Sequence, residues 1–293
     1  MTYSGFVALA GRPNVGKSTF VNAVLGRKLA IVSDRPQTTR RAIRAVHQRD
    51  GRQVVLVDLP GVQRPRDALT ARMARRVQQE LDGADASLLM LAADQGVGPG
   101  DRFIARVLLD AAVPVTIAVN KTDRISRGEQ LAVLAQAAAL VPEAEVFPIS
   151  ARRSEGLELL LEHLAGLMPE GPLLFDADVD SDQPREQLLA ELIREAVIRR
   201  TFQELPHAVE VLIEETETLR EGLVRVRALV WVESESQKGI VIGAGGRMIK
   251  AIGTAARREL QRALGCQVHL ELSVRVRRDW RADEQLLDRL GIT

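Results

Sequence analysis

A glycine loop between an apolar run and a helix constrains the fold of this chain more than any other feature. Residues Gly11 to Ser18 read GRPNVGKS, which matches the phosphate-binding pattern G-x-x-x-x-G-K-S/T. The run GFVALA at 5–10 predicts a strand directly before the loop, and residues 18–25 predict a helix behind it. In such a turn, backbone N–H groups and the helix N-terminus surround a phosphate, while Lys17 reaches the outer phosphates. The sequence therefore predicts a nucleotide-binding α/β domain.

Apolar runs alternate with helix-length segments as far as residue 168. Four of the five runs are apolar enough to be buried on both faces, which is typical of parallel strands. This order predicts an α/β P-loop domain over residues 1–168, with a mostly parallel sheet and helices on both faces. The expected strands are 5–10, 54–60, 87–93, 113–120 and 144–150, and the expected helices are 18–25, 68–81, 101–111, 129–140 and 155–167.

A second motif predicts residues for a magnesium ion. DLPG ends the strand expected at 54–60, so Asp58 is placed to hold Mg²⁺ through a water and the Gly61 amide to meet a γ-phosphate. Upstream, a threonine must supply a further ligand to the ion. Thr38 and Thr39 both qualify, and we favour Thr39. The predicted metal ligands are Ser18, Thr39 and Asp58, and the predicted catalytic residues are Lys17, Thr39 and Gly61.

Two further motifs select the base. NKTD ends the strand expected at 113–120, and one carboxylate, Asp123, can accept both N–H groups of guanine but would face a lone pair on adenine. Asn120 is expected to brace the loops, Lys121 to lie over the base, and the backbone of 150–152 to meet the guanine oxygen. Four motifs in this order, each at a strand end, predict a GTPase. The expected nucleotide contacts are Gly11, Arg12, Pro13, Asn14, Val15, Gly16, Lys17, Ser18, Thr19, Thr38, Thr39, Asp58, Gly61, Asn120, Lys121, Asp123, Ser150, Ala151 and Arg152.

The amino-acid composition of the chain changes after residue 168. Residues 169–184 hold three prolines and five carboxylates and no basic residue, which predicts an extended linker. Residues 185–293 then give the order helix, strand, strand, helix, glycine loop, helix, strand, and a short C-terminal helix. A chain of 293 residues is long enough for two such domains.

The glycine loop of the second half reads GAGG at 243–246. Alone, a G-x-x-G pattern has little weight, but the surrounding order of helices and strands is that of a type II KH module, an α+β RNA-binding domain. There the glycines let an RNA backbone approach, and a groove beside the loop takes about four nucleotides. The expected RNA contacts are Lys238, Gly239, Gly243, Ala244, Gly245, Gly246, Arg247, Lys250 and Arg257.

Charge supports this interpretation. The whole chain has a net charge of only +1, but residues 238–281 carry ten basic and three acidic side chains, a net charge of +7. The preceding residues 204–235 carry eight acidic and three basic side chains, a net charge of −5. The near-zero total therefore conceals a basic region around the second glycine loop, as expected for RNA binding.

Nearly the whole chain resembles GTPases of the Era type, which belong to a superfamily shared with TrmE and EngA. The phrase GRPNVGKSTFVNAVLG, the PQTTR that follows it, and the glycine loop carry the resemblance. It implies a ribosome-assembly GTPase that needs GTP or GDP and Mg²⁺ and binds the 3′ end of 16S rRNA in the small (30S) ribosomal subunit. It also associates Asn14 with a potassium ion, although a turn-stabilising role explains that residue nearly as well.

The chain departs from the family pattern at three positions. Leu59 stands where the family usually has Thr, and Ala244 stands where its RNA loop usually has Lys, a phosphate contact that the nearby Arg247 can replace. Val62 occupies the place of the water-orienting Gln of Ras-like proteins, and valine cannot orient water. We therefore expect slow intrinsic hydrolysis unless another group or ion helps.

Two rival functions and the compartment complete the expectations. A GTPase of tRNA modification would use a cysteine near its C-terminus, but the only cysteine, Cys266, falls on an expected strand. A small-molecule kinase with a basic tail is disfavoured by NKTD. A single cysteine and no signal peptide or apolar run of 18 residues predict a cytoplasmic protein. We expect a monomer without a DNA partner; a peripheral contact with the inner face of the cell membrane is left open.

Overall fold

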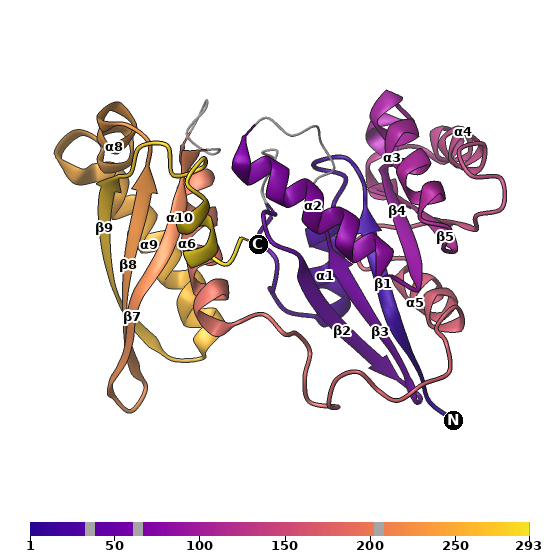
Figure 1. Ribbon diagram of the computed structural model, residues 1–293, viewed down its shortest axis with the longest axis horizontal. Helices are drawn as coiled ribbons and strands as arrows, with labels where there is room; N and C mark the ends of the chain where they lie inside the picture. Colours follow the sequence, from indigo (N-terminus) through magenta and orange to yellow (C-terminus); the bar gives the residue numbers. More distant parts are fainter. Residues whose placement is uncertain (33–38, 61–66, 202–207, 293) are drawn as a thin grey trace. The chain divides into compact units, whose positions relative to one another are not determined.

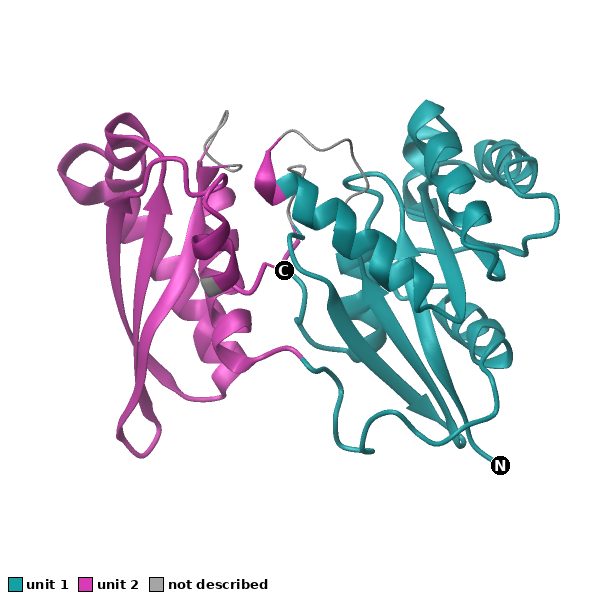
Figure 2. Ribbon diagram, viewed as in Figure 1, with its two compact units in different colours: residues 1–30, 37–66, 70–182 teal, residues 31–36, 67–69, 183–293 magenta. Residues whose placement is uncertain are grey.

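The computed structural model describes residues 1–32, 39–60, 67–201 and 208–292 (Figure 1). The chain divides into two compact units, which Figure 2 colours separately. Unit 1 comprises Met1–Ala30, Gln37–Arg66 and Thr70–Asp182, and unit 2 comprises Ile31–Pro36, Asp67–Leu69 and Gln183–Thr293.

A six-stranded sheet forms the centre of unit 1, with the strand order β2-β3-β1-β4-β5-β6. Neighbouring strands are parallel except β2 and β3, which are antiparallel. Parallel strands are joined through crossovers that cover both faces, which explains why β4 is buried at every residue. The strands are β1 (Tyr3–Ala10), β2 (Ile43–Arg49), β3 (Arg52–Asp58), β4 (Ala86–Ala92), β5 (Val115–Asn120) and β6 (Val146–Pro148).

The alternation of side chains along these strands divides the helices between two faces. Val7 and Leu9 of β1 share a core with α1 and α5, whereas Ala8 and Ala10 share one with α2, α3 and α4. The predicted helices on both faces are confirmed. The helices are α1 (Lys17–Leu25), α2 (Ala68–Asp82), α3 (Pro99–Asp110), α4 (Arg127–Ala138) and α5 (Leu157–Gly166), with 3₁₀ turns η1 (Ala93–Gln95) and η2 (Thr122–Arg124).

Strand β2 is absent from the strands predicted by the sequence. Its sequence IRAVHQR mixes apolar and polar residues, which is typical of a strand at the edge of a sheet, where β2 pairs with β3. The connection to β3 is Asp50-Gly51, with both φ angles positive at 52° and 75°. An Asp-Gly pair in this conformation is the preferred turn of a two-residue hairpin, so this dipeptide is the signal that predicts the strand.

The segment predicted to be an extended linker is hydrogen-bonded along unit 1 as far as Asp182. The Ser4 N–H donates to the Pro169 carbonyl at 3.1 Å, and the Val46 N–H donates to the Asp180 carbonyl at 2.9 Å. Between them, the side-chain oxygen of Gln53 accepts from the N–H groups of Leu174 and Phe175 at 2.8 and 3.0 Å. The acidic segment is therefore extended, as its composition indicates, but it is fixed in place over this length.

Unit 2 contains a three-stranded sheet in the order β7-β8-β9. β7 (Glu210–Arg220) and β8 (Leu223–Val232) form an antiparallel hairpin, and β9 (Gln267–Val276) is parallel to β8. Alternate residues of β8 and β9, from Val224 to Val232 and from Val268 to Val276, face one core. These alternate residues are apolar in both strands.

Helices α6 (Arg185–Ile198), α8 (Glu235–Ile242) and α9 (Arg247–Leu264) supply the rest of this core, and α10 (Glu284–Arg289) follows the last strand. A 3₁₀ turn, η3 (Ala244–Gly246), separates α8 from α9. The order α6, β7, β8, α8, η3, α9, β9 is the predicted KH order, with the glycine loop between two helices. No helix in the four described stretches is long and apolar enough to cross a membrane.

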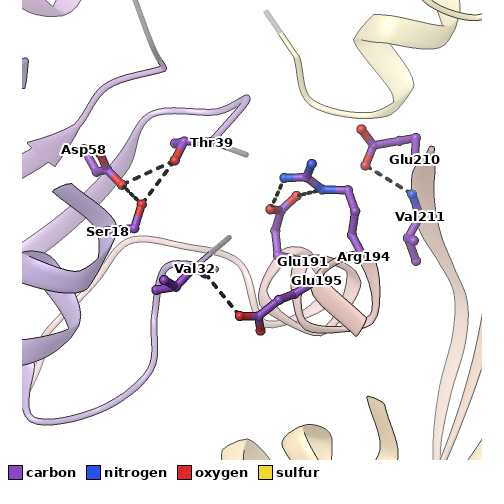
Figure 3. Close-up of polar contacts among 9 residues, drawn as sticks. All are labelled: Ser18, Val32, Thr39, Asp58, Glu191, Arg194, Glu195, Glu210 and Val211. Carbon is purple, nitrogen blue, oxygen red and sulfur yellow. Dashed lines mark hydrogen bonds and ion pairs between the residues drawn. The ribbon is translucent and has the colours of Figure 1, made fainter. Parts of the chain in front are cut away.

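A buried ionic cluster lies on α6 (Figure 3). The Arg194 side chain is fully buried, and its Nε and Nη2 donate to the two oxygens of Glu191 at 3.1 and 2.5 Å. The neighbouring Glu195 is also buried and accepts from the Val32 N–H at 3.2 Å and from Arg199 at 2.8 Å. A two-pronged pair of this kind satisfies two charges that could not otherwise be buried.

Replacing Arg194 by Ala should destabilise unit 2 by about 3–5 kcal/mol, because the buried carboxylates of Glu191 and Glu210 would lose this cation. The double change Glu191→Leu with Arg194→Met removes both charges of the hydrogen-bonded pair and should recover part of this loss, since Glu210 still loses its cation. Both tryptophans of the chain, Trp231 and Trp280, lie in unit 2, so tryptophan fluorescence during urea unfolding reports on it. Equal stability of the single variant and the wild type would show that the pair contributes nothing.

Candidate nucleotide and RNA sites

The first glycine loop lies between the carboxyl end of β1 and helix α1, as predicted. Gly11 and Gly16 must be glycines because neighbouring groups occupy the space that a side chain would need. A Cβ on Gly11 would lie 2.5 Å from the Met90 carbonyl oxygen, and one on Gly16 would lie 2.2 Å from Asn120 Nδ2. Gly16 also has a φ of 104°, which disfavours any residue with a side chain. The loop is therefore held close to β4 and to the NKTD motif.

Lys17 begins α1 and is almost completely buried. Its ammonium donates to the carbonyls of Gly11 and Arg12 at 3.0 and 3.4 Å, which holds it inside the curve of the loop. Burial lowers the pKa of Lys17, and the nearby Asp58 carboxylate opposes this shift. An anionic phosphate in the loop would likewise stabilise the charged ammonium.

Three predicted metal ligands, one from each of three segments, lie together at the end of β3 (Figure 3). The Ser18 hydroxyl donates to Asp58 Oδ2 at 2.8 Å, and Thr39 Oγ1 lies 3.3 Å from Ser18 Oγ and 3.5 Å from the same carboxylate oxygen. Burial raises the pKa of Asp58, whereas Lys17 and the two hydroxyls oppose the shift. Thr38 and Gly61 lie outside the described residues.

This group of oxygens suits a small hard cation. The other carboxylate oxygen, Asp58 Oδ1, is buried and accepts no hydrogen bond from any described residue. Hydroxyl and carboxylate oxygens, together with water, are the ligands that Mg²⁺ prefers. The residues present therefore fit a magnesium ion that Ser18 and Thr39 would ligate directly and Asp58 would hold through a water.

The base motifs meet through a second set of hydrogen bonds. The Asn120 side chain donates to the Val15 carbonyl and accepts from the Ala151 N–H, both at 2.9 Å. The Ser150 hydroxyl donates to Asp123 Oδ1 at 2.7 Å and lowers the pKa of this carboxyl group. The structure thus brings the NKTD and SAR motifs together beside the loop, and the hydrogen bond from Ser150 favours the ionised form of Asp123.

Some predicted contact residues use their side chains elsewhere. The Val15 and Ala151 side chains are buried, so only their backbone can face a nucleotide. The Arg12 side chain binds Asp101 at 2.8 Å and the Gly96 carbonyl at 3.2 Å. The sequence-based prediction missed Asp101 because it lies outside the four nucleotide motifs.

The second glycine loop has one structural glycine and two accessible ones. A Cβ on Gly243 would lie 2.6 Å from the Cβ of Met248, so this glycine is required for packing against α9. Gly245 and Gly246 have φ angles of 61° and 76°, but an added Cβ would meet nothing closer than 4.0 Å, the distance from Gly246 to Ile249. Their backbone is therefore open to a ligand at the N-terminal end of α9.

Cations lie on both helices that this loop joins. Arg247, Lys250 and Arg257 are exposed along α9, and Arg247 Nε donates to the Ala244 carbonyl at 3.2 Å. Lys238, on α8, lies 3.9 Å from the exposed Glu235, a distance at which solvent weakens the attraction. The predicted RNA-binding residues thus lie on two consecutive helices joined by the loop.

Two family models match the chain. One, described as 50S ribosome-binding GTPase, covers residues 6–121, and the other, a KH domain, covers residues 204–281. The chain is 43% identical over 293 residues to the GTPase Era of Mycobacterium sp. (strain KMS), covering 98% of both chains. It is 42% identical over 295 residues to that of Mycobacterium tuberculosis (strain ATCC 25177 / H37Ra), covering 99% of this chain and 98% of the relative.

Two solved structures of Era proteins match this chain over its full length. A crystal structure of Era with MgGDPNP and nucleotides 1506–1542 of 16S ribosomal RNA is 34% identical, with a TM-score of 0.95 and complete coverage of both chains. A point variant of Aquifex aeolicus Era bound to GDP·AlF4⁻ is 33% identical with a TM-score of 0.93, again over both whole chains. The P-loop and KH architecture predicted from the sequence is confirmed, and the chain belongs to the Era family of GTPases.

Proposed function

We propose that this GTPase is a switch that binds single-stranded ribosomal RNA during assembly of the small ribosomal subunit. The observation that carries the proposal is the pair of glycine loops, one enclosing Lys17 in unit 1 and one leaving Gly245 and Gly246 open in unit 2. The related Era structure holds a GTP analogue and a 16S ribosomal RNA fragment in one complex. The match of this chain to both a GTPase model and a KH-domain model supports the same combination here.

In this proposal Mg²⁺ is held by Ser18 and Thr39, with Asp58 acting through a water. When bound, the ion neutralises charge on the β- and γ-phosphates. Lys17 binds the same phosphates, Asn120 keeps the base loop against the P-loop, and Asp123 accepts the guanine donors. Potassium at Asn14 stays a prediction from the family resemblance, and action in the cytoplasm stays a prediction from the single cysteine and the lack of a signal peptide. Val62 lies outside the described residues.

No observation favours the rival functions. Cys266 is partly buried and packs against the core of unit 2, which suits a structural residue better than a nucleophile. A small-molecule kinase would not need a carboxylate poised for guanine, such as Asp123 beside Ser150.

Replacing Asp123 by Asn should change the nucleotide preference of the protein from GTP to XTP. Xanthine carries an oxygen where guanine has its amino group, so an amide can donate where a carboxylate would repel. Competition binding with GTP, XTP and ATP measures the change. A variant that keeps the wild-type preference for GTP would show that Asp123 does not read the base.

Replacing Thr39 by Val should weaken Mg²⁺-dependent binding of a non-hydrolysable GTP analogue, because the methyl group has no lone pair for the ion. Thr39→Ser, the matched control, keeps the hydroxyl and should keep most of the binding. Titrating Mg²⁺ at fixed nucleotide concentration separates the ion from other effects. If the Val and Ser variants need the same Mg²⁺ concentration as the wild type, Thr39 is not a ligand.

Replacing both Gly245 and Gly246 by Asp should abolish binding of a short single-stranded RNA, since two carboxylates would repel phosphate at the point of close approach. The matched pair Gly245→Asn with Gly246→Asn adds similar bulk without charge, and Asn tolerates a positive φ. We expect this control to bind RNA, though less tightly than the wild type. Fluorescence anisotropy at several salt concentrations measures binding, and GTP hydrolysis by the same preparations should be unchanged. Wild-type affinity in the Asp pair would make the loop a simple helix connection.

A further inference from the structure

The connection between β4 and α3, residues 93–101, contains no nucleotide-binding motif, yet it bonds to both nucleotide loops. At one end, Asp94 lies 3.5 Å from the Lys121 ammonium and accepts from Arg124 Nη1 at 2.8 Å. At the other end, Asp101 accepts from Arg12 Nε at 2.8 Å, and the Gly96 carbonyl, between these two, accepts from Arg12 Nη2 at 3.2 Å. Arg12 belongs to the P-loop, and Lys121 belongs to the NKTD motif.

The Arg12 contact is rigid because Asp101 is fixed by its own helix. Asp101 is completely buried, and its second oxygen accepts from the Gly98 N–H at 2.8 Å at the start of α3. Both carboxylate oxygens are thus engaged, one by the helix N-terminus and one by Arg12. Removing the cationic partner of a buried carboxylate costs much free energy, because the negative charge is then left unpaired away from water.

Glycine makes room for this arginine. A Cβ on Gly100 would lie 2.8 Å from Arg12 Cδ and 3.2 Å from its Cγ, and one on Gly98 would lie 3.8 Å from Arg12 Nη1. The aliphatic stem of Arg12 therefore runs close to the backbone of the first turn of α3. A side chain at position 100 would displace the stem.

The Asp94 contact fixes the base loop in a similar way. Lys121 has a φ of 66°, a conformation that residues other than glycine rarely adopt, and its side chain is mostly buried. Asp94 lies in the 3₁₀ turn that follows β4, and its carboxylate contacts the charged groups of both Lys121 and Arg124. This sets the direction of the Lys121 stem, which we expect to cover the base.

We propose that residues 93–101, which we name the β4–α3 brace, position both nucleotide loops for GTP. The proposal rests on the nucleotide site proposed above. Asp101 and Gly96 hold the P-loop through Arg12, and Asp94 holds the guanine loop through Lys121 and Arg124. Asp94 and Asp101 are positioning residues, since each acts through another side chain.

The two ends of the brace should affect different parts of the nucleotide. Losing the Arg12–Asp101 contact loosens the loop around the β-phosphate, so it should weaken binding of GDP more than binding of GMP. Losing the Asp94 contact loosens the base loop, so it should weaken GDP and GMP by the same factor. A role in stability alone would lower the unfolding temperature and leave both the GMP and the GDP dissociation constants of the folded protein unchanged.

The test measures GDP and GMP dissociation constants by competition against a fluorescent GDP, with the full-length protein. Arg12→Met and Asp101→Asn should each raise the GDP constant by about tenfold, as expected for a lost hydrogen bond to a charged group. The double variant should be no worse than either single one, because both remove the same contact. Arg102→Met, an identical change at an exposed residue next to Asp101, is the matched control and should leave both constants unchanged.

Two further variants complete the test. Gly100→Ala displaces the Arg12 stem without removing a charge and should reproduce the change in the GMP to GDP ratio, even where Asp101→Asn folds poorly. Asp94→Ala should raise both constants equally. An unchanged ratio in folded Arg12→Met and Gly100→Ala proteins overturns the brace. If Asp123→Asn also keeps its preference for guanine, the proposed nucleotide site is wrong as well; if Asp123→Asn changes that preference, only the brace is wrong.

Discussion

One amide side chain joins the parts of unit 1 on which nucleotide binding depends. Asn120 donates to the P-loop at Val15 and accepts from Ala151, which follows β6. The contact is possible only because Gly16 has no side chain, since a Cβ there would lie 2.2 Å from the amide nitrogen. Because these loops leave separate parallel strands, their spacing follows from the sheet, and one buried amide then fixes them relative to one another.

The amino-acid sequence alone predicts those parts of the site that reside in single motifs. Each motif follows an apolar run, and carboxyl ends of parallel strands meet at one edge, so Lys17, Asp58, Asn120 and Asp123 are expected to lie together. Contacts made by residues outside the motifs could not be predicted. Asp101 lies 89 positions from Arg12, and nothing local to either residue indicates that they pair. The hydrogen bonds that hold residues 169–182 along unit 1 were missed for the same reason, since the composition of this segment predicts an extended chain but not which residues it contacts.

The glycines show how one residue type serves different physical ends. Gly243 and Gly16 are required because another group occupies the space of a Cβ, and Gly245 and Gly246 are required by backbone conformation alone. A pattern such as G-x-x-G does not distinguish these cases. The distinction matters for function, because a left-handed glycine with open space where its Cβ would be, such as Gly245, exposes its backbone.

The charge count of residues 238–281 overestimates the positive charge available to RNA. Four of its ten cations have a carboxylate within 4.0 Å: Lys238, Arg262, Arg277 and Arg281. Across the described residues, Lys250, Arg257, Arg258, Arg275 and Arg278 have no acidic partner, and Arg247 donates to a carbonyl, which leaves its charge uncompensated. Three of these six, Lys250, Arg257 and Arg258, follow Arg247 along α9, which starts at the open glycines. The uncompensated charge thus begins where the backbone is accessible, and a phosphate chain lying on the loop would meet further cations along the helix.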